Sequence, residues 1–201
     1  MNPLPEDNWS PWSPSELQVR LEGMGEDWYI VGGWALDLWH GRQTREHEDL
    51  EFSVLSIRSQ HYRRALSGLE FFSVADGKLS HLPSAAVVPS NVWQQWGADV
   101  AAGCWRVDMM VDRGTHDHWV YKRDPALRMP RTTAIRTTEY GIPYLAPSIV
   151  LLFKAKHARE KDHHDFHIAL PRLKRQERAD LRRWLEMLHP GHAWIELLGS
   201  E

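Results

Sequence analysis

The sequence predicts an α/β (α+β) protein in which a mixed-sheet domain is followed by a helical C-terminal domain. Residues 28–40 have the pattern of a strand, a glycine turn and a helix. Apolar and polar residues alternate over 50–54 and 105–112, which is the period of a strand with one buried face. Beyond these strands the pattern becomes helical, so we expect a catalytic domain over 1–145 and a helical domain over 146–201.

The chain begins with an irregular proline-containing arm and then a helix. Ser13, Pro14 and Glu16 are an N-cap serine, a first-turn proline and a capping-box glutamate. This pattern predicts a helix that runs to about Gly25.

A glycine turn joins the next strand to the next helix. The β-prone run 28–31 ends at Gly32 and Gly33, and residues 34–40 have helical spacing before Gly41. We therefore expect strand, turn and helix, with backbone N–H groups exposed at the turn.

The rest of the first domain contains further strands and a helix. A helix is expected over 58–69, and a strand over 71–75 that turns at Asp76-Gly77. Residues 118–123 are expected to pair with the strand 105–112 as a hairpin. The second domain is expected to begin with a helix at Pro147 and to contain an amphipathic helix over 174–189.

Composition limits the class of protein. The 201 residues carry a formal net charge of −3, which does not favour extended nucleic-acid binding. The chain starts without a signal-peptide pattern and contains no long apolar run, so we expect a cytoplasmic protein that does not enter the membrane. Cys104 is the one cysteine, which excludes an internal disulfide. The oligomeric state stays open.

Carboxylates interrupt two of the predicted strands. Asp49 and Glu51 fall on one strand face, and Asp108 lies in the middle of the strand 105–112. Such groups would repel each other in a partly buried site unless a cation neutralised them, and Mg²⁺ does so while also binding substrate phosphates. An exposed edge-strand face is the simpler alternative.

The segment before the carboxylates has the groups that polyphosphate binding needs. Gly32 and Gly33 allow phosphate oxygens to approach backbone N–H groups at a helix N-terminus. Four further donors lie between the glycines and the carboxylates: Arg42, Thr44, Arg45 and His47. For the arginines, ordinary ion pairing is the alternative.

The stretch GGWALDLWHGRQTREHEDLE resembles the nucleotidyltransferase superfamily with its polymerase-beta-like fold, and in particular the lincosamide and aminoglycoside adenylyltransferases. The resemblance continues more weakly at WRVDMMV and at IPYLAPSIVLLFKAKHAREKDHHDF. It implies that Asp49 and Glu51 are metal ligands and that Asp108 is a third ligand or the base. It further implies that Gly33 contacts phosphate and that Lys154 reaches the triphosphate.

The resemblance implies Mg²⁺-dependent transfer of a nucleoside monophosphate, with ATP as the expected donor and a hydroxyl-bearing small molecule such as an aminoglycoside or lincosamide as acceptor. Glu51 replaces the aspartate that is commoner in the family, and no motif of an antibiotic pocket is found. The alternatives are a tRNA or protein acceptor, as in toxin-like enzymes, and a catalytically silent nucleotide-binding domain.

Three further expectations concern a helix face that carries two lysines, the histidines and the tryptophans. Lys154, Ala158 and Lys161 are expected to share one helix face toward it, although Lys154 could equally be a solvated lysine. The histidines are interpreted as polar surface groups. The tryptophans are interpreted mainly as core residues, with Trp93, Trp96 and Trp119 as possible stacking groups for a sugar or base.

Overall fold

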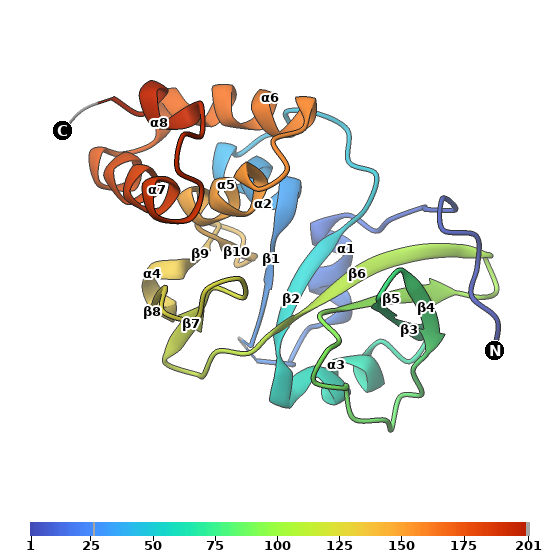
Figure 1. The fold of residues 1–201 in the computed structure, drawn as a ribbon. Helices are drawn as coiled ribbons and strands as arrows, with labels where there is room; N and C mark the ends of the chain where they lie inside the picture. Colours follow the sequence, from blue (N-terminus) through green and yellow to red (C-terminus); the bar gives the residue numbers. More distant parts are fainter. Residues whose placement is uncertain (26, 200–201) are drawn as a thin grey trace.

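The computed structural model describes residues 1–25 and 27–199 and contains a mixed sheet with helices around it, as the sequence predicts (Figure 1). The sheet has eight strands in the order β4-β3-β5-β6-β2-β1-β10-β9, and β7 and β8 form a separate ribbon. The strands are β1 Trp28–Ile30, β2 Glu51–Leu55, β3 Glu70–Ala75, β4 Lys78–His81, β5 Gln94–Asp99, β6 Cys104–Asp112, β7 His118–Val120, β8 Arg128–Pro130, β9 Ile135–Thr137 and β10 Pro143–Leu145.

Helices precede, interrupt and follow the strands. They are α1 Pro14–Arg20, α2 Gly32–His40, α3 Ser59–Ala65, α4 Arg131–Ala134, α5 Pro147–Ala155, α6 Glu160–Ala169, α7 Arg175–Leu188 and α8 Trp194–Leu197, with short 3₁₀ turns at Ser56–Arg58 and Leu170–Arg172. Figure 1 shows α5 to α8 gathered at one end of the molecule, while α3 and β3 to β5 lie at the other. None of the helices in the described ranges is long and apolar enough to cross a membrane.

The two strands that carry carboxylates, β2 and β6, lie side by side in the centre of the sheet. Strand β2 runs parallel to β6 and antiparallel to β1, and Glu51 lies directly opposite Asp108. Because side chains alternate along a strand, opposite residues point to the same face of the sheet. The register therefore decides that these two carboxylates meet.

Local sequence signals explain where α1 and α2 begin and end. The Ser13 side chain accepts from the Glu16 N–H and Glu16 accepts from the Ser13 N–H, which is the predicted capping box. Helix α1 ends at Arg20, earlier than expected, because the chain turns before Gly25. Helix α2 begins at Gly32 and is closed by Gly41 in the left-handed conformation.

The predicted hairpin between 118–123 and the strand β6 is wrong. Strand β6 already has β5 on one side and β2 on the other, so neither edge is free. His118–Val120 pairs instead with Arg128–Pro130 as an antiparallel ribbon. The Asp76-Gly77 turn is confirmed, since β3 and β4 pair antiparallel across it.

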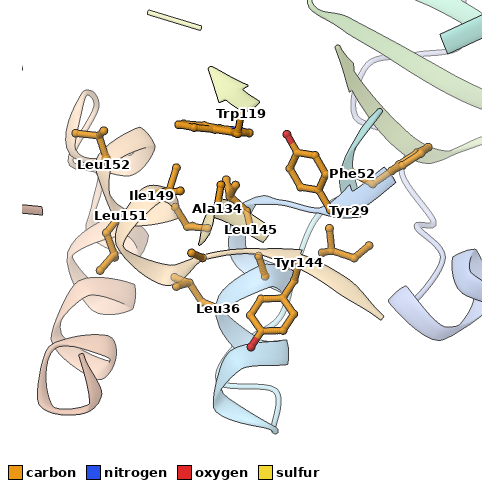
Figure 2. Packing of buried hydrophobic residues seen from close by; sticks show 14 of the residues in the cluster. Tyr29, Leu36, Phe52, Trp119, Ala134, Tyr144, Leu145, Ile149, Leu151 and Leu152 are labelled. Atoms are coloured by element: carbon orange, nitrogen blue, oxygen red, sulfur yellow. The ribbon is translucent and has the colours of Figure 1, made fainter. Parts of the chain in front are cut away.

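The helices after residue 146 share an apolar core with the sheet. Figure 2 shows Ile149, Leu151 and Leu152 of α5 in one cluster with Leu36 of α2 and Leu145 of β10. All five side chains are at most 2 % exposed and belong to one hydrophobic cluster. Burial of this surface fixes the C-terminal helices against α2. The division into two domains at residue 145 stays a prediction.

Helix α5 does not continue to Lys161. It ends at Ala155, Ala158 has a φ of 44°, and α6 begins at Glu160. Lys154 and Lys161 are therefore on different helices, and the expected common face of Lys154, Ala158 and Lys161 is wrong. The break in the helix lies at a residue in the left-handed region, which a continuous α-helix cannot contain.

Candidate active site

Three carboxylates converge at one edge of the central strands. Ligand oxygens of Asp49, Glu51 and Asp108 all lie within 4.8 Å of one another. Glu51 begins β2, Asp49 lies two residues before it, and Asp108 is the partner of Glu51 on β6. The sequence prediction that these three side chains cluster is confirmed.

Burial makes this cluster electrostatically unfavourable without a counter-charge. Loss of hydration, followed by the charge of Asp49, raises the pKa of Glu51 from 4.5 to about 7. Burial and then the charge of Glu51 raise the pKa of Asp108 well above its usual range, and burial also raises that of Asp49. A cation at this place would relieve the repulsion of all three groups.

The donor set fits a hard divalent ion. Asp108 is 2 % exposed, and Gln94 Nε2 donates to its Oδ2 at 2.8 Å. Its Oδ1 is buried and has no hydrogen-bond partner in the described part of the chain. Buried polar oxygens normally have a partner, and oxygen-only carboxylate sites are those that Mg²⁺ prefers. The unpartnered oxygen is therefore consistent with a cation ligand.

Gly32 is required beside Glu51. It has a φ of 62°, and a Cβ atom placed on it would lie 1.8 Å from Glu51 Oε2. A side chain here would both strain the backbone and displace the carboxylate. The glycine thus allows the start of α2 to approach the carboxylate cluster closely.

The N-terminus of α2 lies at the same place. Val31 precedes the helix, and no side chain in the described residues caps it. Its first N–H groups are therefore left to solvent or to a ligand, and the helix dipole favours an anion there. Gly33 is packed against side chains, since a Cβ atom on it would lie 2.5 Å from Arg45 Nη2 and from His47 Cε1.

Asp37 holds the loop that leads from α2 to the carboxylates. It is 3 % exposed and accepts from the Thr44 N–H at 3.1 Å, the Thr44 hydroxyl at 2.5 Å and His47 Nε2 at 2.5 Å. His47 also packs against Trp34, with the rings tilted by 33° and their centroids 4.4 Å apart. The structure thus engages Thr44 and His47 within the protein, whereas Arg42 is exposed on the same loop. Their contact with phosphate stays a prediction.

The two remaining predicted phosphate contacts form ion pairs with α6. Arg45 donates from Nε to Asp165 Oδ1 at 2.9 Å and from Nη2 to Asp165 Oδ2 at 3.1 Å. Lys154 Nζ lies 2.8 Å from Asp165 Oδ2 and 3.1 Å from Asp162 Oδ1. Lys154 is therefore not a solvated lysine, since its side chain is only 9 % exposed.

A cleft of about 440 Å³ runs along the sheet face from Gly32 and Glu51. Its polar wall includes side chains that the sequence did not single out. Those that carry or can carry positive charge are Arg113, Lys122, Arg123, His157 and Arg159, together with the predicted Lys154. Partial loss of hydration and the nearby Arg123 lower the pKa of Lys122, while Asp108 and Glu51 act in the opposite direction. A cleft wall with several positively charged side chains suits a polyphosphate.

The tryptophans divide between core and cleft. Trp96 packs against Trp9 at 5.0 Å, and Trp119 is 3 % exposed beside Phe153. Trp93 and Trp119 both line the cleft, and the Arg113 guanidinium lies 4.6 Å from the ring centre of Trp93. Lys122 Nζ lies 5.9 Å from the same ring. Nothing in the sequence around Trp93 distinguishes it from the others, because its position depends on the pairing of β5 with β6.

The family model of the aminoglycoside-2''-adenylyltransferases matches residues 15–79, a stretch that includes the glycine turn and the strand of Asp49 and Glu51. The match covers about a third of the chain, so this region is similar to that family.

A solved structure shows the same fold. The solution structure of the antibiotic-resistance factor ANT(2'')-Ia has a TM-score of 0.56 and 12% sequence identity, covering 86% of this chain and 89% of that one. The crystal structure of ANT(2'')-Ia in complex with adenylyl-2''-tobramycin has a TM-score of 0.49 and 11% identity, with 92% and 91% covered. No curated protein sequence matched the chain.

Proposed function

We propose that the protein transfers a nucleoside monophosphate, AMP from ATP, to a hydroxyl of a small molecule such as an aminoglycoside or a lincosamide-like antibiotic, with Mg²⁺ as cofactor. The observation that carries this proposal is the cluster of Asp49, Glu51 and Asp108 within 4.8 Å beside the start of α2. The match to the adenylyltransferase family supports an acceptor of the aminoglycoside class.

In this proposal each part of the site has one task. The carboxylates of Asp49, Glu51 and Asp108 would hold Mg²⁺, which supplies charge stabilisation at the transferring and leaving phosphates. Gly32, Gly33 and the first N–H groups of α2 bind phosphate oxygens. Arg42, Thr44, Arg45, His47 and Lys154 are the proposed surroundings of the triphosphate. Lys122 and Arg159 are added to them because they line the cleft together with Lys154.

The reaction is a displacement at the α-phosphorus. The acceptor oxygen forms a bond to phosphorus, the bond from phosphorus to the bridging oxygen breaks, and pyrophosphate leaves. The hydroxyl proton must pass to a base, and we assign either this role or that of a cation ligand to Asp108, whose buried Oδ1 has no hydrogen-bond partner in the described residues. The apolar wall of the cleft, which includes Phe153 and Val150, limits water at the reacting atoms.

Two other functions stay open. A tRNA end or a protein side chain could be the acceptor, and a silent domain could bind nucleotide without transfer. The formal net charge of −3 gives no support to an extended nucleic-acid surface.

The test is pyrophosphate release from each nucleoside triphosphate with Mg²⁺ and a panel of aminoglycosides and lincosamides. We expect release only with an acceptor, and mass spectrometry of the acceptor should show the added nucleotide. If a labelled nucleotide is transferred to RNA or protein but not to small molecules, the acceptor is RNA or protein and not an antibiotic. Nucleotide binding without any release would leave the silent domain as the function.

A further inference from the structure

The segment 42–49, which carries Asp49 at its end, has no helix or strand of its own. Side-chain contacts hold it in place. Asp37 binds Thr44 and His47 from the side of α2, as described above. Helix α6 makes two further contacts, Asp165 with Arg45 and Lys161 with Glu48. The backbone ladder begins only at Leu50, whose carbonyl oxygen accepts from the Asp108 N–H at 2.8 Å, so the segment before it depends on these side-chain contacts.

The two contacts from α6 differ in burial. Arg45 and Asp165 form a bidentate pair with side-chain exposures of 19% and 3%. Lys161 and Glu48 lie 2.9 Å apart, but Glu48 is 83% exposed. Exposed pairs contribute little, whereas a buried bidentate pair holds a fixed geometry. The Arg45–Asp165 pair is thus the contact that can position the segment.

Asp165 has a second partner in the cleft. Its Oδ2 accepts from Arg45 Nη2 at 3.1 Å and lies 2.8 Å from Lys154 Nζ. Arg45 Nη2 is also the atom that would clash with a Cβ on Gly33. The Asp165 carboxylate therefore contacts two positively charged side chains, Arg45 at the glycine turn and Lys154 in the wall of the cleft.

We propose that Asp165 is a positioning residue of the nucleotidyl-transfer site. Through its pair with Arg45 it fixes the segment that ends in Asp49, and through its pair with Lys154 it fixes the ammonium group of that lysine in the cleft wall. The proposal rests on the proposed function, because it assigns Asp165 to the same carboxylate site. Residues that orient metal ligands from outside typically change cation affinity by 10- to 100-fold when they are replaced.

The test is the affinity of the protein for Mn²⁺ alone, measured by titration calorimetry on the full chain. Asp165→Asn keeps the size of the side chain and removes the negative charge that pairs with both Arg45 and Lys154. We expect the dissociation constant for Mn²⁺ to rise about tenfold or more. Glu48→Gln is the matched control, since it breaks the exposed contact between the same segment and α6, and it should change the constant less than about twofold.

Circular dichroism and the melting temperature show whether each variant is folded at the temperature of the titration. A folded Asp165→Asn protein that binds Mn²⁺ within twofold of the wild type would overturn the proposal. So would an equal loss in Glu48→Gln. If Asp165→Asn does not fold, Arg45→Lys decides: it keeps the charge opposite Asp165 and removes the bidentate geometry, so we expect weaker Mn²⁺ binding, and unchanged binding overturns the proposal.

This design separates the two ideas. If the wild type does not bind Mn²⁺, the metal site of the proposed function fails, and the positioning role of Asp165 fails with it. If the wild type binds Mn²⁺ and Asp165→Asn binds equally well, the carboxylate site stands and only the positioning role is lost. As a second readout in the active enzyme, kcat should fall in Asp165→Asn by more than KM rises for the acceptor.

Discussion

Glu51→Gln should stabilise the metal-free protein at high pH. Glu51 is held beside Asp49 and Asp108, and burial together with Asp49 raises its pKa from 4.5 to about 7. The folded state therefore binds this proton more tightly than the unfolded state does. Stability falls as the pH rises from about 4.5 to about 7, and the full penalty is present above that range.

The magnitude follows from the size of this change in pKa. At about 1.4 kcal/mol for each tenfold change in proton affinity, the penalty at pH 8 is at most about 3 kcal/mol. Glutamine keeps the shape of Glu51 and carries no charge, so the free energy of unfolding should rise by up to that amount at pH 8. At about 2–4 °C per kcal/mol for a chain of this size, the melting temperature should rise by up to roughly 6–12 °C.

The assay is thermal and urea unfolding in EDTA at several pH values between 5 and 8. At pH 5 Glu51 is already protonated in the folded state, so Glu51→Gln should differ little from the wild type. Mg²⁺ should stabilise the wild type at pH 8 and stabilise Glu51→Gln much less. Glu139→Gln, at an exposed position, is the control and should change little at either pH.

Two results would refute this reasoning. Equal stability of Glu51→Gln and the wild type at pH 8 would mean that the carboxylates do not repel each other as their spacing requires. An equal gain at pH 5 and at pH 8 would mean that the gain comes from packing rather than from charge.

The remaining predictions concern three other positions. Asp49→Asn should lower nucleotidyl transfer by at least about 10²-fold in a pyrophosphate-release assay while the metal-free protein stays as stable or gains stability, and near-normal turnover would remove Asp49 from catalysis. Lys154→Ala should weaken binding of a non-hydrolysable ATP analogue about tenfold by calorimetry, an effect of about 1.5 kcal/mol, and unchanged affinity would show that the ion-paired lysine does not reach the nucleotide. Gly32→Ala should abolish Mn²⁺ binding because the new Cβ meets Glu51 Oε2. The control is Gly41→Ala, at a φ of 70° with open space around it, which should cost only about 1–2 kcal/mol of stability and keep the site. Equal behaviour of the two variants would argue against the close approach at Gly32.

Local patterns of the sequence were sufficient for the core of the site. The alternation of apolar and polar residues in 50–54 places Glu51 on the polar face, and Asp49 falls on the same side. The glycine turn and the capping box likewise depend on neighbouring residues only. The structure accordingly confirms the carboxylate cluster, the mixed sheet and the helices that begin at Pro14 and Pro147. The roles of these residues in catalysis stay predictions.

Only the tertiary structure decided what lies around the carboxylates. Strand β7 pairs with β8 because both edges of β6 are occupied. The sequence of a single strand does not determine which strands lie next to it in the sheet. The partners of Arg45 and Lys154 come from α6, more than a hundred residues after Arg45 and on the far side of a helix break near Ala158. Charge pairs between distant segments depend on how those segments pack, and a sequence pattern with alternating signs shows only that such pairs are possible.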